Sequence, residues 1–169
     1  MSNVWFTSDW HFGHKNILKY RPDFESREVL EDLILENYKR LVTKRDKVYF
    51  LGDIAFTDEA LEKIAGLQGN KVLVLGNHDT DAKTRPSIQA FAEVFNEIHG
   101  MVKHKGFWIT HCPMHPEELR GKKNIHGHTH DFVLSDPRYL NVCLEQINYG
   151  LIDLNAVKAI FQGREDETV

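Results

Sequence analysis

The sequence predicts an α/β fold in which two β-sheets pack on each other and helices lie outside. Two observations predict it. The first half of the chain alternates between strand and helix patterns, and the second half contains short extended runs with a hairpin pattern. The chain has 169 residues, of which 41% are apolar, which suits one compact domain with a buried core. We therefore expect a single domain over residues 1–169.

Three strand–helix units are expected in the first half. Apolar runs that end in polar residues predict strands at residues 4–7, 48–51 and 71–75. Apolar residues at helical spacing predict helices at residues 28–42, 61–67 and 88–95. Thr57 or Asp58 is placed to cap the second helix, and Pro86 and Ser87 start the third.

The second half is expected to add strands and one more helix. Extended runs at residues 97–103 and 106–111 meet near Lys105 and Gly106, which predicts a hairpin. Short strands are expected at residues 124–126 and 139–144. Asp153 is placed to cap a final helix, which we expect to fray over the polar tail from Gly163 to Val169.

Charge and hydropathy exclude several classes of protein. Lys and Arg total 21 against 25 Asp and Glu, so no global positive field favours strong binding to duplex nucleic acid. The longest apolar runs fall far short of the roughly 20 residues that a membrane span needs. The first residues lack the basic region of a secretory signal, so we expect a cytoplasmic protein. Cys112 and Cys143 are expected to be free, buried thiols.

Nearly every predicted strand ends in side chains that bind metals well. These are Asp9, His11, Asp53, Asn77, His111, His128 and His130. In α/β sheets, ligands bind beyond the carboxyl ends of the strands, so these residues are expected to converge. Each motif alone is weak, since an Asp-x-His or Gly-Asp pair commonly forms only a solvated turn, but together they are specific. Nitrogen and oxygen ligands suit manganese, iron or zinc rather than calcium.

In type and order, these motifs resemble those of the calcineurin-like metallophosphoesterases. The matching segments are Asp9-x-His11, Gly52-Asp53, Gly76-Asn77-His78-Asp79, His111 and Gly127-His128-Thr129-His130. The resemblance implies a four-layer αββα sandwich of two mixed sheets flanked by helices, without a cap domain. It also implies two divalent ions, with manganese expected first and iron or zinc as alternatives. The first would be held by Asp9, His11 and His130, the second by Asn77, His111 and His128, with Asp53 bridging.

The activity implied is hydrolysis of a phosphodiester or phosphomonoester. Two ions about 3.5 to 4 Å apart can share a hydroxide that attacks the phosphorus atom. His78 is expected to stabilise the transition state or protonate the leaving group, and Asp79 to orient its imidazole. The substrate is expected to be a small phosphoester or a nucleotide-like molecule. The sequence departs from the common pattern at Phe12, His14 and Phe56, which leaves every ligand position filled.

The sequence leaves the role of His14 open and favours structural or surface roles for most of the other histidines. His14 is equally compatible with contacting substrate and with supporting a ligand. His99 and His104 are expected to be structural or surface residues, His126 to lie behind the ligand pair, and His115 to sit in a loop near His111. Cys112 should face away from the neighbouring imidazole, since adjacent strand residues point to opposite faces, which disfavours a Cys–His nucleophile.

Loop cations are expected to be mostly solvated, Arg21 among them, with Lys15, Arg85 and Lys122 as candidate phosphate contacts. The alternative function is a catalytically silent scaffold on the same fold. Loss of His78 or of a ligand would favour the scaffold, and all of these residues are present. The sequence does not indicate an oligomeric state.

Overall fold

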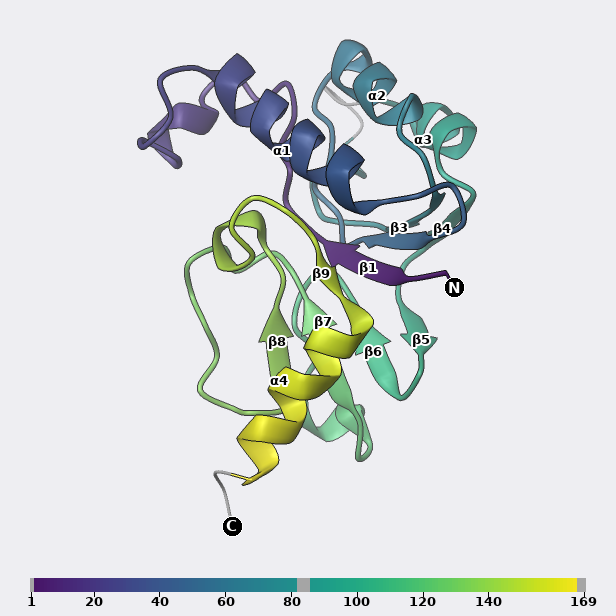
Figure 1. Ribbon diagram of the computed structural model, residues 1–169, viewed down its shortest axis with the longest axis vertical. Coiled ribbons are helices and arrows are strands. Elements are labelled where there is room, and N and C mark those ends of the chain that lie inside the picture. The colour runs from purple at the N-terminus through teal and green to yellow at the C-terminus, as the bar shows by residue number, and fades with distance from the viewer. Residues whose placement is uncertain (1, 82–85, 167–169) are drawn as a thin grey trace.

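Two β-sheets pack on each other in the computed structural model, which describes residues 2–81 and 86–166 (Figure 1). The first sheet has the order β4-β3-β2-β1-β9, and the second has the order β5-β6-β7-β8. The strands of the first sheet are β1 (Val4–Thr7), β2 (Lys47–Phe50), β3 (Asn70–Val74), β4 (Glu97–His99) and β9 (Ile152–Asp153). Those of the second are β5 (Val102–His104), β6 (Phe107–Ile109), β7 (Lys123–His126) and β8 (Tyr139–Asn141).

Both sheets are mixed. In the first, β1 to β4 run parallel, and β9 is antiparallel to β1. In the second, β5 is antiparallel to β6, whereas β6, β7 and β8 run parallel. The predicted α/β class, two mixed sheets flanked by helices, is confirmed.

At the helix starts, capping side chains accept hydrogen bonds from backbone amides that have no partner within the helix. They are α1 (Arg27–Leu41), α2 (Asp58–Ala65), α3 (Ile88–Val94) and α4 (Leu154–Asp166), with 3-10 turns η1 (Ile17–Lys19), η2 (Pro116–Leu119) and η3 (Leu144–Gln146). Ser26, Thr57 and Ser87 each accept a hydrogen bond from the backbone amide three residues later. Thr57 rather than Asp58 is therefore the cap of α2. Figure 1 shows α1, α2 and α3 above the first sheet and α4 across the second.

The central strands are buried on both faces, which explains why they are continuous apolar runs. Phe50 and Leu73 point toward the helices, whereas Tyr49 and Val72 point toward the second sheet. Burial of each such side chain stabilises the fold by about 1.5–3 kcal/mol. Helix α4 joins the core between the sheets through Phe161.

Several predicted elements differ from the structure, among them the strand predicted at residues 106–111, because β6 ends at Ile109. The run at residues 97–103 splits into β4 and β5, which belong to different sheets, and Gly100 lies between them. The hairpin itself is confirmed between β5 and β6, with Lys105 and Gly106 both at positive φ, as a tight two-residue turn requires. The strand predicted at residues 139–144 ends at Asn141, and η3 follows. Helix α4 continues to Asp166, so the frayed tail expected from Gly163 is helical up to that residue.

The two cysteines occupy different environments. Cys143 is buried, as predicted, but Cys112 is exposed, so its assignment to the core was wrong. Strand β6 ends at Ile109, and Cys112 therefore lies in a loop, where the alternation of strand side chains does not apply. Within the described residues, no helix is both long enough and apolar enough to cross a bilayer.

Candidate metal centre

The seven residues predicted as ligands lie in loops that follow five different strands. β1, β2 and β3 end at one edge of the first sheet and β6 and β7 at one edge of the second, and the packing of the two sheets brings these edges together. The backbone there is unusual. Five of the seven residues have positive φ: Asp9 (58°), His11 (54°), Asp53 (55°), His128 (70°) and His130 (46°). Such conformations cost residues other than glycine roughly 1–3 kcal/mol each and concentrate at functional sites.

The first cluster consists of Asp9, His11 and His130. The Oδ1 atom of Asp9 lies 3.6 Å from Nε2 of His11 and 3.6 Å from Nε2 of His130. Two atoms that ligate one tetrahedral ion at about 2.1 Å stand roughly 3.4 Å apart. Asp9 Oδ1 and His11 Nε2 are buried and have no hydrogen-bond partner. Since buried polar atoms are almost always partnered, this cluster fits a divalent cation.

The orientation of Asp9 is fixed through its other oxygen. Oδ2 accepts hydrogen bonds from the Ser8 hydroxyl, from the backbone amide of His128 at 2.9 Å and from the Cys143 thiol at 3.2 Å. These donors leave Oδ1 directed at the two imidazoles. Gly127 is required here, because a Cβ atom on it would collide with the Ser8 hydroxyl.

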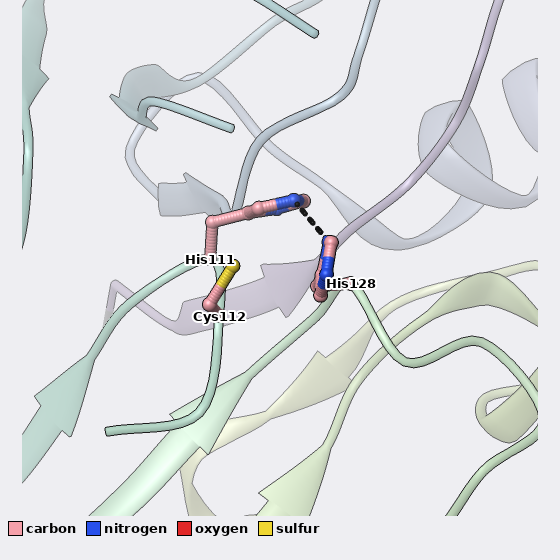
Figure 2. A group of neighbouring side chains, drawn as sticks. All are labelled: His111, Cys112 and His128. Atoms are coloured by element: carbon pink, nitrogen blue, oxygen red, sulfur yellow. Dashed lines mark hydrogen bonds between the residues drawn. The ribbon is translucent and has the colours of Figure 1, made fainter. Parts of the chain in front are cut away.

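The second cluster is centred on His111. Its Nε2 atom lies 2.9 Å from Oδ1 of Asn77 and 3.1 Å from Nδ1 of His128. Figure 2 shows the His111–His128 hydrogen bond, with Cys112 beside the pair. The Cys112 sulfur lies within 4.8 Å of a nitrogen of each imidazole, so the expectation that this thiol faces away from His111 was wrong. The Nδ1 atom of His111 donates to the carbonyl of Leu51 at 2.6 Å, which directs Nε2 into the site. The three side chains predicted for the second ion are thus brought together.

Asp53 lies between the two clusters. Its Oδ2 atom is 3.9 Å from Nε2 of His11 and 3.4 Å from Nε2 of His111. Its Oδ1 atom accepts the backbone amide of His78 at 2.8 Å. One oxygen is therefore held by the protein, and the other faces both imidazoles, as a bridging ligand requires.

The metal-free cluster combines ionised carboxylates with a charged imidazole. Burial opposes ionisation of Asp9, but the surrounding imidazoles of His11, His111 and His130 lower its pKa well below the usual range. Burial alone would lower the pKa of His111, but Asp53 and Asp9 raise it to about 9. The two carboxylates therefore favour the protonated, positively charged form of His111.

A pocket of about 420 Å³ opens beside the first cluster, and His78 lines it together with His11 and His130. The His78 ring lies 5.9 Å from that of His11. Asp79 does not have the predicted role of orienting His78. It is buried, and its carboxylate accepts the backbone amides of Asp53, Ile54 and Gly76. It therefore fastens the loop after β3 to the loop after β2.

His14 and Phe56 form part of the surroundings of this pocket. His14 lines it, and its ring lies 4.8 Å from that of Phe56. Phe56 is buried and also contacts the rings of His11 and His78. Of the three candidate phosphate contacts, Lys15 and Lys122 are not among the described residues that line the pocket. Arg85 lies outside the described residues.

Four other histidines lie away from both clusters. His99 interacts with Glu97, and His104 packs against Tyr49, in keeping with structural roles. His126 is buried behind His128, and its Nδ1 lies 2.8 Å from the carbonyl of Gly127. His115 is exposed and caps η2.

Arg21 and Glu145 support the first cluster, and the sequence did not reveal this. Arg21 is 2% exposed rather than solvated, and its guanidinium donates to the carbonyls of Asp9 and Trp10. It also pairs with Glu145 at 2.8 Å, and Oε1 of Glu145 lies 3.2 Å from Nδ1 of His130. Only the fold brings together residues 124 positions apart.

Known proteins match the sequence over most of its length. The uncharacterized protein MJ1445 of Methanocaldococcus jannaschii is 31% identical, and the match covers 100% of this chain and 97% of that protein. The gene 66 protein of Mycobacterium phage L5 is also 31% identical, over 77% of this chain and 78% of its own length. This chain belongs to the family of these two proteins. No known family model matches the sequence.

Solved structures support the fold. The protein of unknown function AQ665 from Aquifex aeolicus superposes with a TM-score of 0.75 at 27% identity, covering 95% of this chain and 100% of that one. A metallophosphoesterase from Sphaerobacter thermophilus and an archaeal phosphodiesterase superpose less well, with TM-scores of 0.45 and 0.47 at 16% and 18% identity. At these scores, the likeness supports no conclusion about activity.

Proposed function

We propose that this protein is a metal-dependent phosphoesterase that hydrolyses a small phosphodiester or phosphomonoester. One observation carries the proposal: two ligand clusters share the Oδ2 atom of Asp53, and the first contains the buried atoms Asp9 Oδ1 and His11 Nε2, which have no hydrogen-bond partner. The cluster lies beside a pocket large enough for a small ester. Manganese is the ion we expect first, with iron or zinc as alternatives.

The two ligand groups divide the work of holding the ions. Asp9, His11 and His130 would hold one, and Asn77, His111 and His128 the other, with Asp53 between them. When bound, two such ions would act as Lewis acids and lower the pKa of the water bound to them toward neutral pH. The protein keeps each ligand oriented through contacts behind it, such as the Leu51 carbonyl on His111 and Glu145 on His130.

His78 is the candidate catalytic residue. Its backbone amide is held by Asp53, so the imidazole extends from the edge of the metal centre into the pocket. There it can donate a hydrogen bond to a phosphoryl oxygen or a proton to the departing alkoxide. Asp79 contributes by holding the loop that carries His78 and is a positioning residue rather than a catalytic one.

Turnover of two simple esters tests the proposal. Metal-stripped protein is restored separately with manganese, iron, zinc or magnesium and assayed with bis(p-nitrophenyl) phosphate and p-nitrophenyl phosphate. We expect metal-dependent release of nitrophenol and its loss in Asp53→Ala, together with part of the bound metal. His78→Ala should lose turnover but keep its metal. Asp32→Ala, which removes an exposed carboxylate from α1, is the matched control.

The outcomes separate an enzyme from a scaffold. Turnover that is unaffected by Asp53→Ala would arise elsewhere and contradict the proposal. An active His78→Ala protein would remove that residue from the mechanism. Tight binding of metal without turnover of either ester, for any of the four ions, would instead favour a metal-binding scaffold.

A further inference from the structure

The pocket beside the first cluster has one wall that the chemistry of the metal centre does not use. Besides His11, His78 and His130, the pocket is lined by Glu145, which supports His130, and by four residues without a role at the metal centre: His14, Ile17, Tyr20 and Asp131. Ile17 is buried, whereas the Tyr20 side chain is 72% exposed. A single exposed aromatic residue is ordinary on a protein surface. Tyr20 is unusual because its ring borders the same pocket as His11, His78 and His130.

The backbone that carries Tyr20 is held firmly. Its amide donates to the carbonyl of Ile17 at 3.0 Å, at the end of η1. The residues on which this turn depends, Ile17 and Arg21, are both buried, and Arg21 is tied to the Asp9 and Trp10 carbonyls. The Tyr20 ring also lies 6.3 Å from that of His14. The aromatic surface is therefore offered from an anchored turn, which lowers the entropic cost of binding a flat group on it.

We propose that the substrate is a small phosphodiester that carries a nucleobase, and that the base packs against Tyr20 while the phosphate reaches the metal centre. This inference rests on the proposed phosphoesterase function. Any nucleobase can stack on the face of a tyrosine ring, because every base has a flat aromatic surface. The exposed carboxylate of Asp131, on the same pocket wall, can accept a hydrogen bond from an amino group on the ring edge.

The charge of the wall favours a diester over a monoester. Asp131 and Glu145 both line the pocket. Glu145 is paired with Arg21, but Asp131 adds negative charge close to the site of reaction. A phosphomonoester carries up to two negative charges near neutral pH and a phosphodiester only one, so the diester is repelled less. The pocket volume of about 420 Å³ suits a mononucleotide rather than a long strand.

Two substrates that differ only in the base test this inference. Manganese-loaded protein is given adenosine 2′,3′-cyclic phosphate or the base-free ribose 2,3-cyclic phosphate, and hydrolysis is followed by chromatography. We expect kcat/KM for the adenosine compound to fall roughly 5- to 100-fold in Tyr20→Ala, since removing a stacking aromatic residue commonly has an effect of this size. The ribose compound should be unaffected, and Tyr20→Phe should keep most of the preference.

Phe132→Ala is the matched control, because Phe132 is also a strongly exposed aromatic residue, at 63%, but does not line the pocket. It should behave as wild type with both compounds. Equal kcat/KM for the two compounds, or equal losses in Tyr20→Ala and Phe132→Ala, would overturn the inference while leaving the phosphoesterase proposal in place.

If the protein hydrolyses neither compound nor bis(p-nitrophenyl) phosphate, the proposed function fails, and binding tests the pocket separately. Calorimetry of manganese-loaded protein with the same two cyclic phosphates, which are not hydrolysed in this case, should then show tighter binding of the adenosine compound, dependent on Tyr20. Equal binding would overturn the inference on this route too.

Discussion

The two ligand clusters of the candidate metal centre differ in how they satisfy their polar atoms. In the first, Asp9 Oδ1 and His11 Nε2 face each other at 3.6 Å and are buried without hydrogen bonds. In the second, the His111 imidazole is hydrogen-bonded to the side chains of Asn77 and His128. Two ligand atoms of the first cluster thus have no hydrogen-bond partner, whereas those of the second are hydrogen-bonded to one another.

Burial and support follow the same division. Asp9 and His11 are buried, and the first cluster has Arg21 and Glu145 behind it. Asn77 and His128 are exposed in the second. An ion entering the first cluster relieves atoms that are already desolvated and unpaired. An ion entering the second must first break hydrogen bonds between its ligands. We therefore expect unequal affinities, with the first cluster binding more tightly.

The largest expected effect is the difference between His130→Ala and His128→Ala in affinity for the first equivalent of manganese. His130→Ala removes a ligand of the first cluster, so affinity for the first equivalent of manganese should fall by more than the roughly 10–100-fold that loss of a supporting partner causes. His128→Ala should leave the first equivalent nearly unchanged and weaken the second. Calorimetric titration of metal-stripped protein measures both steps. Equal losses of the first equivalent in the two variants would contradict the proposed difference between the clusters.

A smaller effect is expected from Glu145→Gln. This change removes the charge that raises the pKa of His130 and orients its ring, but keeps the shape of the side chain. Manganese affinity at the first cluster should fall about 10–100-fold. At saturating manganese, kcat should return toward the wild-type value, because Glu145 acts through His130 and not on substrate. Glu62→Gln, an exposed change on α2, is the control. A low kcat that excess metal does not restore would assign Glu145 a different role.

The strand ends of the centre could be predicted from the sequence, but the support behind them could not. A polar residue after a short apolar run is a local pattern, and parallel strands bring such positions to one edge whatever the loop lengths. Asp9 and Asp53 therefore meet at one edge of the first sheet, and the packing of the second sheet brings His111 to them. Arg21 and Glu145 are joined only by folding, across 124 positions, and no periodicity marks either of them.

The errors at Cys112 and Asp79 have a common cause. Both expectations placed a side chain from the residue before it in the sequence. Cys112 was expected to alternate with His111 along a strand, and Asp79 to pair with the imidazole of His78. Both residues lie in loops, where backbone turns set the side-chain direction. The Asp79 carboxylate instead accepts hydrogen bonds from the buried backbone amides of Asp53, Ile54 and Gly76. Unpaired backbone amides in a buried loop are costly, and the sequence alone does not show where they lie.

The smallest expected effect concerns pH and the second cluster. Asp53 and Asp9 raise the pKa of His111 from 6.5 to about 9, so its protonated form stabilises the metal-free fold. This contribution amounts to at most about 3 kcal/mol, is complete below pH 6.5 and is lost as the pH rises from 6.5 through about 9. The melting temperature of metal-free protein should therefore fall between pH 7 and 9 as His111 loses its proton. The fall should be smaller in Asp53→Asn, which lacks one of the two carboxylates that raise the pKa of His111.

The same proton opposes metal binding. His111 must give up the proton on Nε2 before that atom can ligate an ion, so binding to the second cluster should release a proton below pH 9 and strengthen as the pH rises. Calorimetric titrations in two buffers of different ionisation enthalpy count the protons released at each step. We expect the larger release with the second equivalent of manganese, beyond the protons that His130, whose pKa is also raised, releases with the first. Proton release confined to the first equivalent would mean that the ion enters beside His111 first, and the order of affinities proposed for the two clusters would be reversed.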